Sequence, residues 1–245
     1  MSTLPASGRL AWWGTAWLRG AVGPDELIDA VQGDDVRHVV VGDQGDGSLL
    51  GALVEARRSG TTAVGAVFPT PGDLFGLRGP RTLNTAAVEA GEAALLLGAG
   101  RALVPSRVGH AVEWTALPAE RRMPPDLGEA DRGLRAVLPH AADTLAELDV
   151  AAWAPDAADE LIDLHRRDDL PGPPGVPERC VDLAARALRL GAIVEAALAD
   201  HGGALSVVQI EQRRAVLDEL ERAGRRALTA ACSPDGWPPD NLHGR

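Results

Sequence analysis

Residues 36–41 read Val-Arg-His-Val-Val-Val, and this short β-branched run decides the predicted fold. A run of this length and composition is typical of a buried strand. Downstream, Ser48 precedes an apolar helical pattern that stops at Gly60, so we expect Ser48 to cap a helix. Residues 61–68 then form a second strand-like run.

Strand, helix and strand in this order fit within about thirty residues, which is the size of a βαβ unit. Such units have parallel strands joined by a right-handed crossover. We therefore expect residues 36–41 and 61–68 to be parallel neighbours in one sheet.

Further elements are expected after this unit. Asn84 is expected to cap a short helix that runs through Ala90. Residues 93–97 and 101–104, separated by Gly-Ala-Gly, predict a hairpin, and residues 112–117 predict another strand. A helix over residues 86–97 is the alternative, because an apolar run alone does not separate helix from strand.

Two helices are expected before the first strand. Trp12, Trp13 and Trp17 lie at helical spacing, and Gly20 ends the pattern. Helix-spaced aromatic residues usually pack inward, so we expect a core position, with a partner interface as the alternative. Residues 24–33 begin with proline and two acidic residues and end with glycine, which predicts a second short helix.

The β-type patterning ends in a polar, proline-rich stretch near residue 120. We therefore predict an α/β domain at residues 1–120, a linker at 121–127, a helical domain at 128–232 and a flexible tail at 233–245.

The helical domain is predicted from three amphipathic segments, each with one apolar stripe on an otherwise charged helix. A shorter helix is expected after Pro155. The stripes must bury one another or a partner, so a small antiparallel bundle is the economical arrangement. The predicted fold is thus an α/β (or α+β) N-terminal domain with a βαβ unit, followed by an all-α helical bundle. The stripes are Leu134, Leu138, Ala141, Leu145 and Leu148; Leu183, Ala187, Leu190, Val194 and Ala197; and Val216, Leu220, Ala223 and Ala227.

Composition excludes several classes of function. The formal net charge is -11 and no run of Arg offers a basic face, so nucleic acid is not an expected partner. All 24 basic residues are Arg, and the lack of Lys excludes Schiff-base chemistry and a P-loop lysine.

The expected location is the cytoplasm, with no membrane contact. The apolar stretch from Leu10 to Leu18 is too short to span a bilayer and lacks a cleavage pattern. Cys180 and Cys232 belong to no CxxC pair, which fits two free thiols in a reducing compartment.

The candidate ligand site is formed by the loops that follow the two predicted strands. In open parallel sheets, ligands bind beyond the carboxyl ends of the strands, where helix N-termini present unpaired N–H groups. Asp43, Asp46 and Ser48 follow the first strand, and Thr70 and Asp73 follow the second. Both loops are expected at the same edge of the sheet.

Three residues of the long loop and helix that come next, Arg78, Arg81 and Asn84, are expected to reach over this site. The site would then take a small anion such as a nucleotide or a sugar phosphate.

The same loops also have a simpler interpretation. Their glycines allow positive φ in tight turns, and Ser48 needs to do no more than cap its helix. The spacing matches neither the dinucleotide fingerprint nor a P-loop. Asp43, Asp46 and Asp73 offer an alternative Mg²⁺ site, but no metal and no cofactor is predicted.

Two other constellations predict no chemistry. His140, Asp143, Glu160, Asp163 and His165 lack the Glu-x-x-His spacing of di-iron bundles, which favours solvated helix faces.

No Gly-x-Ser-x-Gly elbow is present. Cys180 has apolar neighbours and is expected in the core, and His38 is expected to point to solvent or a neighbouring loop.

The leading hypothesis is a non-catalytic binding or assembly protein whose Ala-rich helices form a homo-oligomeric or partner interface. The alternative is an enzyme or sensor that binds a small anion at the carboxyl edge of the βαβ unit.

Overall fold

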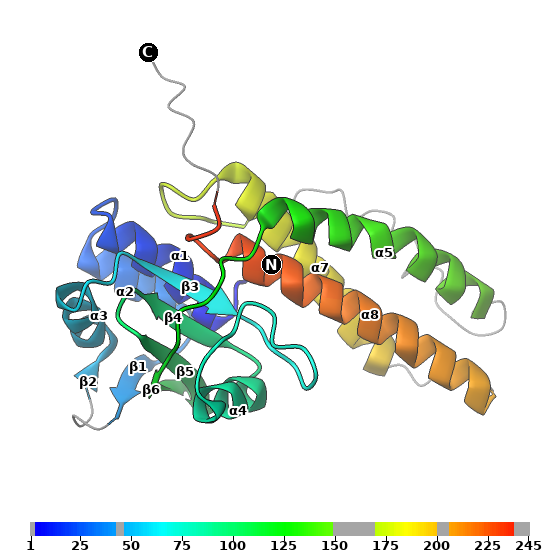
Figure 1. Cartoon of the computed structure of the whole chain (residues 1–245), viewed down its shortest axis with the longest axis horizontal. Helices are drawn as coiled ribbons and strands as arrows, with labels where there is room; N and C mark the ends of the chain where they lie inside the picture. Colours follow the sequence, from blue (N-terminus) through cyan, green and yellow to red (C-terminus); the bar gives the residue numbers. More distant parts are fainter. Residues whose placement is uncertain (1–2, 43–46, 149–169, 200–205, 238–245) are drawn as a thin grey trace, which may run out of the picture.

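The chain forms an α/β domain from which a group of long helices extends to one side (Figure 1). The computed structural model describes residues 3–42, 47–148, 170–199 and 206–237. Helices and strands are interspersed up to residue 118, and within the described residues only helices follow. The predicted α/β domain followed by a helical domain is therefore confirmed.

The two N-terminal helices form as predicted. Helix α1 spans Ala6–Leu18 and α2 spans Pro24–Gln32. Helix α2 has Pro24 in its first turn and stops at Gly33, which adopts a φ of 54° that a side chain would disfavour. The tryptophans of α1 pack inward, because Trp12 is fully buried and Trp17 is only 9% exposed.

One sheet of six strands forms the centre of the α/β domain, in the order β2-β1-β6-β5-β4-β3. The predicted hairpin over residues 93–97 and 101–104 is confirmed as the antiparallel pair β4 and β5. The helix alternative for residues 86–97 holds only as far as residue 90. The strands are β1 (Arg37–Val41), β2 (Gly47–Ser48), β3 (Ala63–Val67), β4 (Ala93–Leu97), β5 (Arg101–Val108) and β6 (Ala111–Pro118).

The expected parallel pairing of β1 with β3 is wrong. Strand β1 is parallel to β6, and β6, β5, β4 and β3 alternate in direction. Strand β3 therefore runs opposite to β1. Four inter-strand spacings of about 4.8 Å place the two strands roughly 19 Å apart, and their carboxyl ends face opposite edges of the sheet.

Helices cover both faces of the sheet. Helices α1, α2 and α3 (Leu49–Arg58) pack on one face, where Leu10, Leu53 and Trp114 are fully buried. Helix α4 (Arg81–Ala90) packs on the other face, over Leu95 and Val104. Because both faces are covered, the strands carry nearly continuous apolar runs.

The free edge of β3 is covered by helices instead of by another strand. Thr15 of α1 uses its hydroxyl to accept from Val64 N (2.9 Å) and to donate to Val64 O (3.1 Å). Farther along the edge, Ala66 N donates to Cys232 O at 2.8 Å and Phe68 N donates to Thr229 Oγ1 at 3.2 Å. Every residue of β3 is therefore buried, although it is an edge strand.

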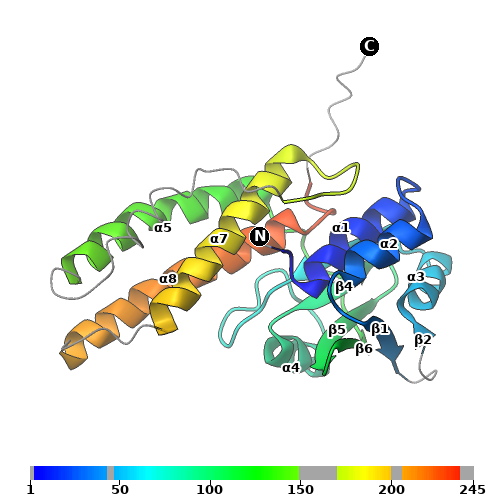
Figure 2. The ribbon, with the colours of Figure 1, turned by 180° about the vertical axis from the view of Figure 1, so that it is seen from behind.

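The described part of the helical domain consists of α5 (Leu127–Leu148), α7 (Glu178–Ala199) and α8 (Val207–Ala231). Helix α8 packs against both of the others, and the three lie side by side in both views (Figures 1 and 2). The predicted stripes face inward, with Leu134, Leu190 and Leu220 at most 2% exposed. The helix expected after Pro155 falls outside the described residues.

Ser206 begins α8 with a capping box. Its hydroxyl accepts from Gln209 N at 3.3 Å, and the Gln209 side chain accepts from Ser206 N at 2.9 Å. At the other end, α8 reaches the sheet, so the bundle core continues into the α/β domain through Trp12 and Phe68.

The segment between the domains is anchored by Arg122, whose side chain is only 4% exposed. It donates to Gly76 O at 3.0 Å, to Ser233 Oγ at 3.0 Å and to Asp235 Oδ1 at 2.7 Å. Residues 233–237 are therefore held in place, which corrects the expected flexible tail; residues 238–245 lie outside the described part of the chain.

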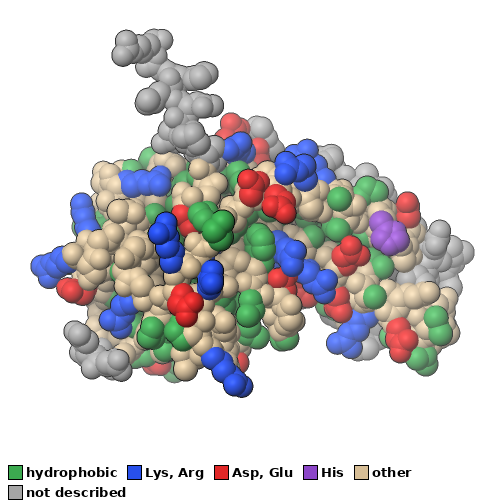
Figure 3. Space-filling view, in the orientation of Figure 1, with side chains coloured by type: hydrophobic (Ala, Val, Ile, Leu, Met, Phe, Trp, Pro, Cys, Tyr) green, Lys and Arg blue, Asp and Glu red, His purple; other side chains and the backbone are tan. Residues whose placement is uncertain are grey.

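None of the described helices is both long and apolar enough to cross a membrane. On the face shown in Figure 3, basic and acidic side chains are interspersed over the described part of both domains. This mixture is typical of solvated helix faces.

Candidate functional site: a pocket between the two domains

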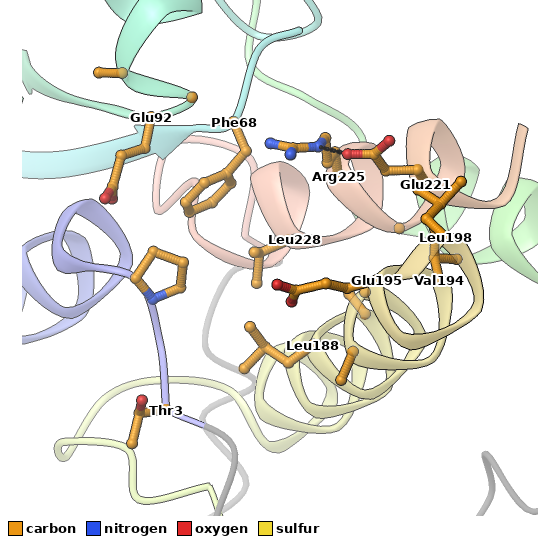
Figure 4. Close-up of a pocket in the computed structure, with 17 residues that line it drawn as sticks. Thr3, Phe68, Glu92, Leu188, Val194, Glu195, Leu198, Glu221, Arg225 and Leu228 are labelled. Carbon is orange, nitrogen blue, oxygen red and sulfur yellow. Dashed lines mark hydrogen bonds and ion pairs between the residues drawn. The ribbon is translucent and has the colours of Figure 1, made fainter. Parts of the chain in front are cut away.

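A pocket of about 670 Å³ lies where the sheet, the start of α1 and the helical domain meet. Its walls come from five separate segments: residues 3–5, the residue that follows β3, the turn after α4, the second half of α7 and the second half of α8. Figure 4 shows the side chains that line it.

The centre of the pocket is apolar. Phe68 follows β3 and is 5% exposed, and Leu228 of α8 is 7% exposed. Leu188 of α7 faces them from the opposite wall (Figure 4). Phe68 is held in place by the bond from its backbone N–H to Thr229, so the docking of α8 on the strand also shapes the pocket.

Small residues leave the space open. Gly191 and Ala192 line the pocket from α7, and Gly224 lines it from α8. A Cβ atom added at Gly191 would meet nothing within 4 Å, whereas one at Gly224 would lie 3.5 Å from Leu190. Gly191 is therefore a pocket-lining position with open space around an added Cβ atom.

Charged groups surround this apolar centre. Arg225 Nε donates to Glu221 Oε1 at 2.8 Å, so these two residues neutralise one another. Glu195 of α7 is exposed to solvent and points toward the middle of the pocket (Figure 4). Glu92 lies on the opposite wall and is partly buried.

Glu92 also caps α1, because its Oε2 accepts from Ser7 N at 2.7 Å. An anion is favourable at a helix N-terminus, where backbone N–H groups lack partners. Burial nevertheless raises the pKa of Glu92 above its usual 4.5, and the bond from Ser7 offsets this only in part. A cation beside this carboxylate would therefore be stabilising.

A buried polar network includes Arg9, which lies in the first turn of α1. Asp35 accepts from Arg9 at 3.0 Å and from Arg107 at 2.7 Å, and His38 Nε2 lies 3.2 Å from it. Trp114 Nε1 is 3.1 Å from His38 Nδ1. Since an indole N–H can only donate, Nδ1 must accept, and His38 is neutral with its proton on Nε2.

This network is structural, because both ring nitrogens of His38 already have partners. The His38 side chain is 4% exposed and contacts Asp35 in the loop before β1. It therefore points to a neighbouring loop, one of the two expected alternatives, and not to solvent. Burial lowers the pKa of His38 below 6.5 despite the neighbouring Asp35.

Among the described residues, those predicted to bind an anion are not brought to one place. Ser48 caps α3 as expected, accepting from Gly51 N at 3.0 Å. Thr70 and Asp73 share a turn after β3, at the far end of the sheet from Ser48. Asp43 and Asp46 lie outside the described residues.

The remaining predicted residues have other neighbours. Asp73 binds Arg226 of α8 through both carboxylate oxygens, at 2.8 and 3.2 Å. Arg78 lies 3.9 Å from Glu120. Arg81 is the exposed first residue of α4.

The expected cap at Asn84 is wrong, because α4 begins three residues earlier and has Pro80 at its N-cap. The Asn84 Oδ1 atom is buried and has no hydrogen-bond partner within the described structure.

A smaller pocket of about 290 Å³ adjoins the loop before α3, lined in part by Ser48, Gly51 and Arg101. Of the predicted ligand residues that the structure describes, only Ser48 lines it.

The other predicted constellations add no site. Among the described residues, no group of three or more His, Cys, Asp or Glu side chains is placed to hold a metal ion. His140 and Asp143 lie on α5, while Glu160, Asp163 and His165 lie outside the described range.

Cys180 and Cys232 are free and fully buried. Burial raises the pKa of Cys180 to about 12 and raises that of Cys232 as well. Both are thus unreactive thiols at neutral pH.

Sequence reasoning missed Glu92 and Glu195, because no spacing rule links two residues on unrelated segments. The sequence signal that could have indicated the pocket is the presence of Gly191 and Gly224 within two helices that are otherwise predicted from their apolar stripes. A glycine there costs about 1 kcal/mol relative to alanine, so it indicates a packing or functional constraint.

Fold and pocket together define a two-domain protein, in which an α/β domain and a helical domain enclose an apolar cavity with acidic walls. The chain belongs to the Rv1486c-like protein family: residues 7–130 match its N-terminal domain and residues 128–229 match its C-terminal domain. No curated protein and no solved structure matches the chain.

Proposed function

We propose that the chain is a non-catalytic binding protein that holds a small ligand between its two domains. The observation that carries this proposal is the pocket of about 670 Å³ walled by α7, α8 and the end of β3. Ligand sites favour domain interfaces and apolar cavities with a few polar groups. The Ala-rich helices, expected to be an interface, supply one side of this cavity.

A pocket-filling variant tests the proposal. Gly191→Phe adds a ring where a Cβ meets nothing within 4 Å, so it should block the pocket without unfolding the chain. Gly133→Phe is the matched control, because Gly133 is an exposed helical glycine with equal space that does not line the pocket.

The measurement is a thermal-shift screen of a small-molecule library against both variants and the unmodified chain. The proposal expects compounds that raise Tm for the unmodified chain and for Gly133→Phe, but not for Gly191→Phe. If no compound raises Tm for Gly133→Phe without also raising it for Gly191→Phe, the proposal is wrong.

The same screen addresses the small-anion alternative. Strands β1 and β3, whose parallel pairing was the basis of that site, are neither neighbours nor parallel, and its remaining support is the pocket beside Ser48 and Arg101. Stabilisation by nucleotides or sugar phosphates that Arg101→Gln abolishes would favour it over the interdomain pocket.

A second candidate function is self-association through the free end of the bundle. Leu198, Val207, Val208 and Ile210 are 45–71% exposed there. The exposed surface of α8 carries both charge signs, including Glu211, Arg214, Glu219 and Arg222. An antiparallel second copy of α8 can therefore set Arg against Glu, as a two-fold interface requires.

Light scattering at micromolar concentration tests self-association. A dimer that the double variant Val207→Glu and Ile210→Glu converts to a monomer would support it, and a monomeric unmodified chain would exclude it. Nucleic acid is not proposed as a partner, given the net charge of -11. We place the protein in the cytoplasm on the basis of its two free cysteines.

A further inference from the structure

The interdomain pocket has two carboxylates whose charge no ion pair in the described structure neutralises. Glu221 is paired with Arg225. Glu195 forms no hydrogen bond or ion pair with any described residue, and it points toward the centre of the cavity (Figure 4). Glu92 Oε2 accepts from Ser7 N at the start of α1, and Glu92 forms no ion pair within the described residues.

Between these two carboxylates the wall is apolar. Phe68 and Leu228 are at most 7% exposed, and they lie between Glu92 on one wall and Glu195 on the other (Figure 4). A ligand that lies across the pocket would therefore have a carboxylate at each end and apolar side chains along its middle. An anion would be repelled by Glu195, because Arg225 of the pocket lining is already paired with Glu221. A neutral ligand would leave the charge of Glu195 without a partner.

We infer that the ligand is an organic cation with an apolar body, such as an alkylamine or an aliphatic diamine. This inference rests on the proposed function, because it names the class of ligand for the same pocket. The ammonium group pairs with Glu92 or Glu195, and the hydrocarbon chain packs on Phe68, Leu188 and Leu228. A bare metal ion is a poorer fit, since no cluster of three or more ligand side chains exists among the described residues.

The two carboxylates are expected to contribute unequally. Glu195 is exposed, and an exposed ion pair is worth at most about 1 kcal/mol, so Glu195→Gln should raise Kd about 3- to 5-fold. Glu92 is partly buried, and a bond to a buried charged group contributes more binding free energy than a bond to an exposed one. Glu92→Gln should therefore raise Kd about tenfold. Glutamine retains the oxygen that accepts from Ser7.

Isothermal titration at pH 8 with octylamine, 1,8-diaminooctane, octanol and octanoate measures the preference. These probes share one chain length and differ in charge. The two amines should bind more tightly than octanol, and octanoate should bind most weakly. Glu211→Gln is the control, because Glu211 is an exposed carboxylate of α8 that does not line the pocket.

The outcomes separate the two proposals. If octanol or octanoate binds at least as tightly as the amines, and Gly191→Phe blocks that binding, the cation preference is wrong while the binding function stands. If amine binding is equal in Glu92→Gln, Glu195→Gln and Glu211→Gln, the assigned carboxylates are wrong. If no probe and no library compound depends on Gly191, both proposals fail.

Discussion

At the scale of single residues, the buried network around Asp35 and His38 couples the stability of the fold to pH. Burial alone would raise the pKa of Asp35, but hydrogen bonds from His38 and Arg107, with the charges of Arg107 and Arg9, lower it below 3.8. Asp35 therefore stabilises the fold at neutral pH, and this contribution is lost only in strong acid. Protonation of His38 changes the stability of the fold at a higher pH than protonation of Asp35 does.

We predict that the free energy of unfolding falls as pH decreases below about 6.5. The pKa of His38 is lowered in the folded chain from 6.5, so between the folded and unfolded pKa values the unfolded state binds more protons. Acidification therefore favours unfolding. Protonation of Nδ1 would also deprive the Trp114 N–H of its acceptor. Urea unfolding at pH 8.0 and 5.5 measures the effect.

Two variants separate His38 from other acid effects. His38→Gln should unfold with about 1–2 kcal/mol less stability at pH 8 because its bonds are disturbed, but with a smaller loss between pH 8 and 5.5. His110→Gln, at an exposed turn, should behave like the unmodified chain. An unchanged pH dependence in His38→Gln would contradict the assignment.

At the scale of elements, β3 explains why the topology was predicted wrongly. An apolar run such as residues 63–67 usually lies inside a parallel sheet, with strands on either side. Here α1 and the end of α8 complete the hydrogen bonds of an edge strand, which gives the same burial. Because those partners come from residue 15 and from residues 229–232, no local pattern could indicate them.

We predict that Thr15→Val destabilises the fold by about 2–3 kcal/mol. The substitution preserves shape but leaves the N–H and C=O of Val64 buried without partners, and each such loss costs about 1–3 kcal/mol. Urea unfolding gives the total, and hydrogen exchange should show faster exchange at the Val64 amide.

Thr62→Val is the control for this edge. Thr62 is exposed and immediately precedes β3, so its replacement should change stability by no more than about 0.5 kcal/mol. Equal effects of the two substitutions would mean that the Thr15 hydroxyl does not complete the edge.

Other elements were predictable because their signals are local. Ser48 caps α3 as its position indicates, and the stripe from Leu183 to Ala197 is buried as its spacing indicates. The pocket was not predictable in this way. Glu92 and Glu195 lie on opposite walls of the pocket only because α8 docks on β3, and that contact depends on residues from both ends of the chain.

At the scale of the whole molecule, Arg122 joins the two domains. It contacts the loop after β3 through Gly76 and the residues after α8 through Ser233 and Asp235. Its guanidinium also lies over Gly65, where an added Cβ would approach it to 2.5 Å. A charged residue in the predicted linker is thus part of the interior.

We predict that Arg122→Met lowers the free energy of unfolding by about 2–4 kcal/mol. The change keeps the length of the side chain but removes a buried ion pair and leaves polar groups unpaired. Urea unfolding followed by circular dichroism measures it, and the transition should broaden as the domains become less coupled.

Arg121→Met is the neighbouring control, because Arg121 is exposed and its loss should change stability by about 0.5 kcal/mol or less. A similar response from both variants would show that Arg122 does not couple the domains.

The closure of β3 by α8 has a consequence for the newly made chain. The bond between Phe68 and Thr229 spans 161 residues of sequence. Synthesis proceeds at about 5–20 residues per second, so roughly 10–30 s pass between synthesis of the carboxyl-terminal half of β3 and synthesis of the α8 residues that cover it. Thr15 protects Val64 from the outset, so the stretch from Ala66 to Phe68 is where a nascent chain is most open to pairing with another copy on the ribosome.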